Sequence, residues 1–305
     1  MIMKHKKYLC SLIGLIIFSA LLYYPALVFA FQSENAEEWF NKAQNENDYK
    51  LKIQYYNQAI EFDSKYVDAY IYRAIAYYNL NQFRQAIDDY TKAIKLSPED
   101  ATIFNRRGYS YYRLGEYQNA LNEYDQAIAL DSNTPLYYIN RGRAYFGLKE
   151  YQKAIDSYTE AIQLDPNNAT TYNRRGYAYF LLEDYRKSLS DHNKAIHIDS
   201  TSPVYYVNRG NAFYKSGEYM KAMTDYSRAI ENDPKYSWAY YNRGNAYLML
   251  EGFDKKAFGD YYQAGLLFVE QKNKSQALIC VEKMKELDPS SYLVNALMDK
   301  IDLIE

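Results

Sequence analysis

The chain has 305 residues, of which 48% are hydrophobic and 24% charged, a balance that excludes a disordered chain and allows one or two packed domains or an extended array. Its 36 Lys and Arg residues are matched by 38 Asp and Glu residues, and the formal net charge of −2 argues against a nucleic-acid partner, which a strongly positive surface would attract. Tyrosine is abundant at 38 residues, and this side chain is favoured where its ring packs and its hydroxyl stays wet.

The N-terminal segment 1–30 has the pattern of a secretory signal peptide. Three lysines precede an uncharged apolar run from 9 to 22, and Val28, Phe29 and Ala30 form a suitable cleavage site. We therefore expect an extracytoplasmic protein, periplasmic or secreted, that begins at Phe31. An uncleaved membrane anchor is the alternative, because the uncharged stretch from Tyr8 to Phe31 is long enough to cross a bilayer.

From position 67 onward the sequence repeats at a constant interval. The stretch "NRRGYSYY" at 105 returns as "INRGRAYF" at 139, "NRRGYAYF" at 173, "VNRGNAFY" at 207 and "YNRGNAYL" at 241. A fixed period of this size is the signature of a stacked array of repeats. It carries a ladder of arginines, at Arg73, Arg107, Arg141, Arg175, Arg209 and Arg243. A ladder of glycines follows it, at Gly108, Gly142, Gly176, Gly210 and Gly244.

Each repeat is predicted to fold as two helices. In residues 101–134, Gly108 lies on a first helical stripe, and Ala120 and Ala127 lie on a second, with a break at 114–116 between them. Small residues at these positions let the two helices approach closely. We expect six regular units, at 67–100, 101–134, 135–168, 169–202, 203–236 and 237–264.

The two ends of the array depart from the regular pattern. Residues 31–66 are predicted to form a degenerate first unit that is shortened by three residues, and the unit 237–264 contains a one-residue insertion in "EGFDKKA". We expect residues 265–305 to form a terminal helical cap or degenerate repeat, because the last unit of a stack has no neighbour to cover it. Gly265 and Phe268 also allow an overlapping register.

These units resemble tetratricopeptide repeats (TPR) of the bacterial type NRGxAYxxLGxYxxAIxDYxKAIxLDP, which residues 139–166 match almost in full. The resemblance implies an all-α fold, a right-handed α-solenoid of antiparallel helix pairs whose first helices line a concave groove. It also implies a non-catalytic scaffold or adaptor that binds a protein or peptide in this groove and uses no cofactor. The groove residues so implied are Asn105, Tyr109, Tyr112, Ile139, Arg143, Phe146, Asn173, Tyr177, Phe180, Val207, Asn211, Tyr214, Trp238, Tyr241 and Asn245.

The arginine ladder is predicted to be structural. An acidic residue stands sixteen positions after most of these arginines, as Glu123 after Arg107 and Asp225 after Arg209, with Ser157 as the exception. A helix pair folded back on itself would join them in charge-assisted hydrogen bonds. The alternative is a row of cations that face a ligand, which we disfavour because an arginine beside a packing glycine should point between the helices.

Alternate units are more alike than neighbouring ones. Residues 101–116 match 169–184 better than they match the unit between them, and "DSNTP" at 131 has its counterpart in "DSTSP" at 199. The array is therefore interpreted as copies of a block of two units, with a groove that alternates between Asn/Tyr and aliphatic levels.

Catalytic and metal-binding interpretations lack a supporting pattern. His192 and His197 are five residues apart, which misses the spacing of a helical metal pair, and His192 stands where other units carry tyrosine. No set of nucleophile, base and orienting group is evident. The second functional hypothesis is a carbohydrate or cell-wall binding module, because tyrosine and tryptophan rings stack on sugars.

Overall fold

The structure, a computed structural model, describes residues 35–304. All of its regular elements in that range are helices, and the chain divides into two compact units on either side of the 98/99 boundary, which are described separately. The predicted signal segment 1–30 lies outside the described residues. None of the helices within 35–304 combines the length and apolarity needed to cross a membrane.

The first unit consists of two helix pairs. These are α3 (Ala36–Asn45) with α4 (Tyr49–Phe62), and α5 (Val67–Asn79) with α6 (Phe83–Leu96). Helix α3 has 10 residues where α5 has 13, so the three residues missing from the first repeat are taken from its first helix. Asn35 caps α3 by accepting a hydrogen bond from the backbone N–H of Glu38 at 3.0 Å.

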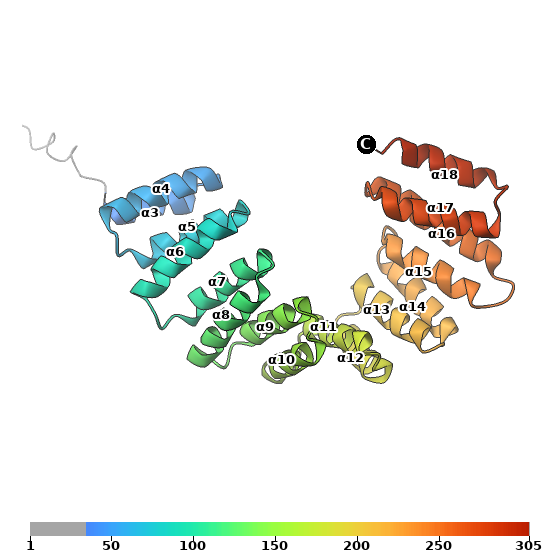
Figure 1. The fold of residues 1–305 in the computed structure, drawn as a ribbon, viewed down its shortest axis with the longest axis horizontal. Coiled ribbons are helices and arrows are strands. Elements are labelled where there is room, and N and C mark those ends of the chain that lie inside the picture. The colour runs from blue at the N-terminus through green and yellow to red at the C-terminus, as the bar shows by residue number, and fades with distance from the viewer. Residues whose placement is uncertain (1–34, 305) are drawn as a thin grey trace, which may run out of the picture. The chain divides into compact units, whose positions relative to one another are not determined.

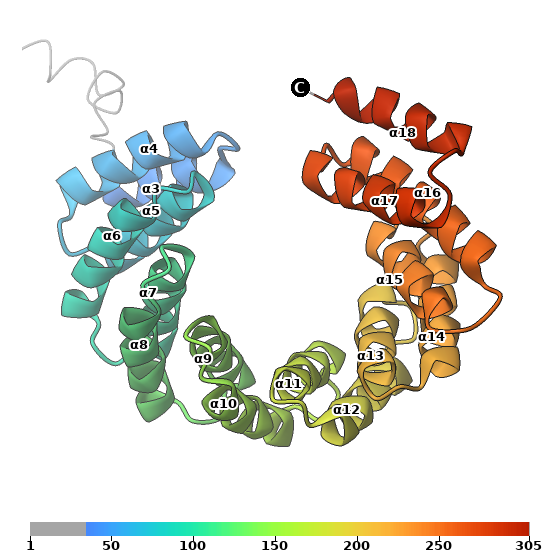
Figure 2. The ribbon, with the colours of Figure 1, turned by 45° about the vertical axis from the view of Figure 1, so that its right-hand side comes forward.

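The second unit continues the same alternation of first and second helices. Its elements are α7 (Ala101–Arg113), α8 (Tyr117–Leu130), α9 (Pro135–Gly147), α10 (Tyr151–Leu164), α11 (Ala169–Leu181), α12 (Tyr185–Ile198), α13 (Pro203–Lys215), α14 (Tyr219–Asn232), α15 (Ser237–Leu248), α16 (Asp254–Glu270), α17 (Lys274–Leu287) and α18 (Tyr292–Asp302). The pairs follow one another along a curve, with α7, α9, α11 and α13 on its inner side and α8, α10, α12 and α14 on its outer side (Figures 1 and 2). The chain is therefore an all-α solenoid of helix pairs.

Local sequence determines where these helices begin and end. Asp100 accepts a hydrogen bond from the backbone N–H of Thr102 at 2.8 Å, and Pro135 and Pro203 occupy the first turns of α9 and α13, where no N–H is needed. The turn between paired helices needs one residue in the left-handed region. Gly115 fills it at φ 77° without strain, whereas Glu183 adopts φ 61° at the same place between α11 and α12.

The glycine ladder lets paired helices come into contact. A Cβ atom on Gly142 would lie 2.6 Å from Cε1 of Tyr158, and one on Gly210 would lie 2.6 Å from Cε1 of Tyr226. In the pair α11–α12 the neighbour of Gly176 is instead Cε1 of His192, at 2.9 Å. The second helices thus place a buried ring against each of these glycines.

The last expected unit boundary, at 264/265, falls inside helix α16. This helix of 17 residues is the second helix of the pair with α15 and also packs against α17, so it belongs to two successive layers. Gly265 lies where a Cβ would meet Leu297 of α18 at 2.5 Å, and Cys280 of α17 at 3.3 Å. The expected boundary therefore lies within one helix, whose Gly265 and Phe268 follow the overlapping register that the sequence also allows.

Candidate functional site

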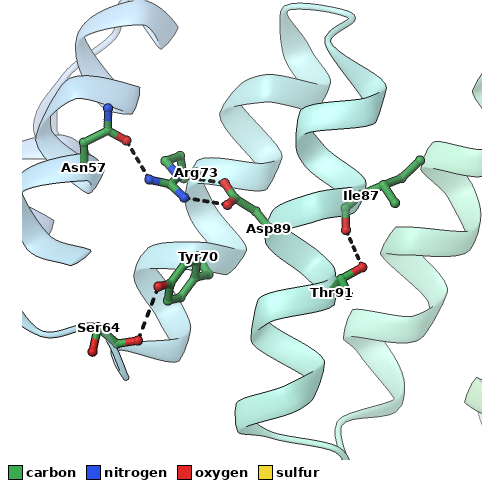
Figure 3. A network of polar contacts seen from close by, with 7 residues as sticks. All are labelled: Asn57, Ser64, Tyr70, Arg73, Ile87, Asp89 and Thr91. Atoms are coloured by element: carbon green, nitrogen blue, oxygen red, sulfur yellow. Dashed lines mark hydrogen bonds and ion pairs between the residues drawn. The ribbon is translucent and has the colours of Figure 1, made fainter. Parts of the chain in front are cut away.

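Every arginine of the ladder points between helices. Arg73 on α5 donates from Nε and Nη2 to the carboxylate of Asp89 on α6, at 2.7 and 2.5 Å (Figure 3). Its Nη1 donates to Asn57 Oδ1 on α4 at 2.6 Å, so a single guanidinium joins three helices of the first unit. Such paired, forked bonds hold both the position and the orientation of the side chain.

The same geometry recurs in the second unit. Arg107 is bonded to Glu123, Arg175 to Asp191, Arg209 to Asp225 and Arg243 to Asp260, with closest N–O distances between 2.6 and 2.8 Å. Arg141 is the exception that the sequence indicates, because it donates to Ser157 Oγ at 3.2 Å and to the exposed carboxylate of Asp125 at 3.0 Å. These arginines therefore form bonds within the helix framework.

A second set of ladder partners was missed by the sequence analysis. Nη1 of four arginines in the second unit reaches a polar residue sixteen positions earlier, on the second helix of the preceding pair. These contacts are Arg141 to Asp125, Arg175 to Thr159, Arg209 to Asn193 and Arg243 to Ser227, at 2.7 to 3.0 Å. The sequence signal for these contacts was a polar residue at the same place in every unit. Through them, each of these four arginines also links successive pairs.

Each ladder arginine also lies against the aromatic ring three residues before it. The distance from the guanidinium carbon to the ring centroid is 5.5 Å for Tyr70 under Arg73 and 5.7 Å for Tyr172 under Arg175. A cation over a ring face is an attractive contact. The aromatic positions that repeat with the array thus pack against the ladder arginines.

The inner face of the second unit is lined with rings from its first helices. Tyr109 stacks with Tyr112 at a centroid distance of 6.0 Å, and Tyr177 stacks with Phe180 at 5.9 Å. Phe146 on α9 lies 5.7 Å from Tyr177 on α11, so the stack continues from one pair to the next. Tyr177 remains 38% exposed.

These rings are supported from behind by aromatic residues that open the second helices. The ring pairs are Tyr112 with Tyr117, Phe146 with Tyr151, Phe180 with Tyr185 and Tyr214 with Tyr219, at 5.3 to 5.8 Å. On α15, Trp238 lies 5.8 Å from Tyr241 and is 40% exposed. Most of the predicted groove rings are therefore half-buried, Tyr177 and Trp238 are more exposed, and contacts with neighbouring rings hold them in place.

Three of the predicted groove residues do not face the groove. Asn105 and Asn173 are buried, and their Oδ1 atoms accept hydrogen bonds from Nδ2 of Asn140 and Asn208, each at 2.9 Å. Val207 is also buried and packs in the core beside Tyr226. The groove assignment of these three was wrong because their position turns toward the next first helix, where a lone polar group needs a buried partner. Ile139, at the equivalent position, is half-buried.

A hollow of about 180 Å³ opens on the inner face where α11, α13, α14 and α15 meet. Its lining residues are Phe180, Asn211, Tyr214, Lys215, Tyr226, Asn242 and Asn245. Asn211 Oδ1 accepts hydrogen bonds from the Tyr226 hydroxyl at 2.8 Å and from Asn242 Nδ2 at 3.0 Å. Asn245 Oδ1 likewise accepts from the Tyr261 hydroxyl at 2.7 Å.

These bonds orient the amides so that their donors are available. The Nδ2 groups of Asn211 and Asn245 have no hydrogen-bond partner within residues 35–304, and Lys215 forms no ion pair there. An amide whose oxygen is held by a buried tyrosine presents two N–H donors in a fixed direction. The hollow is therefore a donor-rich pocket with one aromatic wall, suited to carbonyl or carboxylate oxygens.

The two histidines of α12 have different surroundings. His197 is exposed, whereas His192 is fully buried and neither of its ring nitrogens has a hydrogen-bond partner in the described structure. Burial, with the nearby charge of Arg209, lowers the pKa of His192 from 6.5 to about 3. Between residues 35 and 304, no group of three or more His, Cys, Asp or Glu side chains is arranged to hold a metal ion.

Comparison with known proteins agrees with this architecture. A family model described as a TPR repeat matches residues 76–115, 108–149, 142–183 and 210–250. The fold and the repeats together place the chain in the class of α-solenoids. It is a tetratricopeptide repeat protein.

Solved structures with the same fold share little sequence with the chain. The crystal structure of MamA protein is 25% identical with a TM-score of 0.52, and the match covers 55% of this chain and 92% of that one. A tetratricopeptide repeat protein from Parabacteroides merdae ATCC 43184 is 18% identical with a TM-score of 0.57, covering 77% and 98%. The C-terminal part of a TPR repeat-containing protein from Cytophaga hutchinsonii is 18% identical with a TM-score of 0.56, covering 75% and 98%. No curated protein matches by sequence.

Proposed function

We propose that the protein is a non-catalytic scaffold that acts outside the cytoplasm and binds a segment of another protein along the inner face of α7, α9, α11, α13 and α15. Tetratricopeptide repeats typically serve as protein-interaction surfaces, which supports a protein partner in general. The partner's chain is held by side chains that the repeat framework keeps in place, and no reaction step is assigned to any residue.

The hollow at Asn211 and Asn245 carries this proposal. Their amide donors and the Lys215 ammonium lie beside the exposed edges of Phe180 and Tyr214. An extended peptide has carbonyl oxygens at regular intervals and apolar side chains between them, so it supplies acceptors for the amides and apolar groups for the rings. Preorganised donors bind such a chain with little loss of side-chain entropy.

The ring packing favours a protein over a carbohydrate partner. A sugar stacks on an open ring face, but Tyr109 and Tyr112 stack on each other, as do Tyr177 and Phe180. Their edges remain accessible, and edges suit the aliphatic and aromatic side chains of a peptide better than the flat face of a sugar.

Site-specific cross-linking tests the proposed binding face. A photoreactive phenylalanine analogue that replaces Lys215 on the inner face should cross-link to a protein in cells that express the full chain. The matched position is Lys194, which is exposed on the outer helix α12. Equal cross-linking at both positions, or a cross-link to glycan alone, would show that the inner face is not a protein-binding surface.

The location outside the cytoplasm rests on the signal pattern in residues 1–30. N-terminal sequencing of protein from the native host should find Phe31 as the first residue and place the protein outside the cytoplasmic membrane. An intact Met1 in a membrane fraction would instead support the uncleaved anchor.

A further inference from the structure

The first helices α7, α9, α11, α13 and α15 contain no acidic residue. The sequences of α7, α9, α11, α13 and α15 carry ten Lys or Arg side chains but neither Asp nor Glu. The acidic residues of the same pairs lie on the second helices and in the turns, as Glu123 on α8 and Glu150 before α10. Acidic charge is thus absent from these five first helices, whereas the second helices α10, α12 and α14 carry charges of both signs.

Half of these ten cations are already neutralised. They are the five ladder arginines of the unit, which bond to partners on second helices. The other five are Arg106, Arg113, Arg143, Arg174 and Lys215. Among them, Arg143 and Arg174 lie on the neighbouring first helices α9 and α11.

Arg143 and Arg174 both influence the same buried group. Both charges act on the buried phenol of Tyr158, where they oppose the rise in pKa that burial causes. The Nε atom of each guanidinium is buried and has no hydrogen-bond partner in the described part of the chain. Neither arginine forms an ion pair there, in contrast to every arginine of the ladder in the second unit.

Rings enclose the Arg143 guanidinium. Its central carbon lies 5.1 Å from the centroid of Tyr109 and 4.7 Å from that of Tyr112. Contact with two rings holds the planar group in one orientation and reduces its exposure to water. A partly dehydrated arginine without a carboxylate is an incomplete ion pair, and an anion from outside the chain would complete it.

The same location two repeats later is the amide-lined hollow. Asn211 occupies the position of Arg143 two repeats further along the chain, and Asn242 likewise occupies the position of Arg174. Tyr226 replaces Tyr158 behind them. The inner face therefore offers two equivalent levels with different chemistry, an arginine pair followed by an amide pair.

We propose that the partner of this face is an acidic, extended peptide segment, with one carboxylate held between Arg143 and Arg174 and neutral backbone held at Asn211 and Asn245. This inference rests on the proposed function and specifies its partner class. Two guanidinium groups bind a carboxylate through charge-assisted, forked hydrogen bonds. A long nucleic acid fits less well, because the acidic residues of the turns and second helices repel a continuous polyanion.

Fluorescence anisotropy with the full chain tests the charge preference. The first probe is a fluorescein-labelled dodecapeptide of alternating Asp and Tyr, the second has Asn in place of every Asp, and the third is single-stranded oligothymidylate. We expect the acidic peptide to bind at least tenfold more tightly than the other two. Its affinity should fall as salt is raised, because exposed charge interactions are screened.

Paired variants test the site. Arg143→Gln with Arg174→Gln should reduce binding of the acidic peptide to the level of the neutral one. Arg186→Gln with Lys194→Gln removes the same charge from the outer helix α12 and should change the affinity less than twofold. Arg143→Lys with Arg174→Lys keeps the charge but not the fork, and it should restore part of the lost affinity. A melting curve for each variant checks that it is folded.

The possible results separate this inference from the proposed function. Equal binding of both peptides, together with a protein cross-link at Lys215, would keep the scaffold function and refute the acidic partner. Failure of both peptides and of the cross-link would refute both proposals. Tighter binding of oligothymidylate, or unchanged binding by the folded Arg143→Gln, Arg174→Gln variant, would also refute the acidic-peptide site.

Discussion

The neighbouring pairs α11–α12 and α13–α14 share one backbone plan but differ inside. In α13–α14 the buried Tyr226 donates its hydroxyl to Asn211 Oδ1 at 2.8 Å. In α11–α12 the equivalent residue is His192, which is fully buried with both nitrogens unpartnered. The hydroxyls of Ser188 and Thr171 in this pair are also buried and unpartnered within the described residues.

The difference shows that fold and local stability have separate origins in a repeat array. Both pairs keep the ladder, since Arg175 and Arg209 each bond a buried aspartate at 2.8 Å or less. What varies is whether the remaining buried polar groups are satisfied, and an unsatisfied group costs about 1 to 3 kcal/mol. Because repeats depend mainly on their neighbours, we expect residues 169–202 to open more readily than residues 203–236.

The largest expected effect comes from replacing a ladder arginine, which both pairs contain. Arg175→Ala and Arg209→Ala each leave a buried aspartate without its cation, and each should lower the free energy of local unfolding by about 3 kcal/mol or more. Arg141→Ala is the matched control and should cost about 1 kcal/mol, because its partners are a serine and an exposed aspartate. Hydrogen exchange measures all three.

Equal losses at positions 141 and 209 would mean that the buried carboxylate is not what makes the ladder important. Loss of peptide binding by a variant that remains folded would place the ladder on the ligand-binding face.

Substitution of a ladder glycine should lower stability by a smaller amount, and by different amounts in the two pairs. Leucine at Gly210 meets the Tyr226 ring at 2.6 Å, and leucine at Gly176 meets the smaller imidazole of His192 at 2.9 Å. Overpacking of this kind costs roughly 1 to 3 kcal/mol, and we expect Gly210→Leu to be the more damaging change. Thermal unfolding compares them, and hydrogen exchange should show the loss confined to the altered repeat and its neighbours.

Acid should weaken α11–α12 before α13–α14. The pKa of His192 is lowered from 6.5 to about 3, so below pH 6.5 the unfolded chain binds a proton that the folded chain rejects. Above pH 6.5 His192 is neutral in both states and does not change the free energy of unfolding. As the pH falls below 6.5 the free energy of unfolding decreases, by about 2 kcal/mol at pH 5. Hydrogen exchange at pH 7 and pH 5, corrected for the intrinsic exchange rate, tests whether 169–202 is affected first.

The smallest expected effect is a gain in stability. His192→Tyr restores the residue that the other pairs carry and removes two unpartnered nitrogens, so it should stabilise residues 169–202 by about 1 kcal/mol at pH 7. It should also abolish the acid sensitivity described above. A variant that melts at a lower temperature than the parent would show that the imidazole is better accommodated than its contacts indicate.

Much of the fold follows from residue spacing. The constant repeat interval predicts the helix pairs, and the spacing of sixteen between Arg107 and Glu123 or Arg209 and Asp225 predicts contacts that the structure contains. The two residues of each such pair lie within a single helix hairpin, where their sequence separation largely determines their distance. The register through α16 was harder to predict, because two overlapping stripes compete for one helix.

The inner face was only partly predictable. Phe146, Tyr177 and Trp238 lie in contact with other groove rings, but Asn105, Asn173 and Val207 turned out to be buried between repeats. Helical spacing alone does not distinguish a position that faces a ligand from one that faces the next repeat, since the two are neighbours on the helix surface. The polar residues sixteen positions before the ladder arginines were visible in the sequence and were overlooked.

The sequence by itself determined the repeat, its two helices and the bonds within each pair, because these depend on contacts between residues of one short hairpin. Tertiary structure decided which polar side chains are shared between pairs. The bond from Arg209 to Asn193, the pairing of Asn105 with Asn140, and the approach of Arg143 and Arg174 to Tyr158 all depend on how one pair is rotated against the next. That rotation results from the combined packing of many side chains, and no single repeat encodes it.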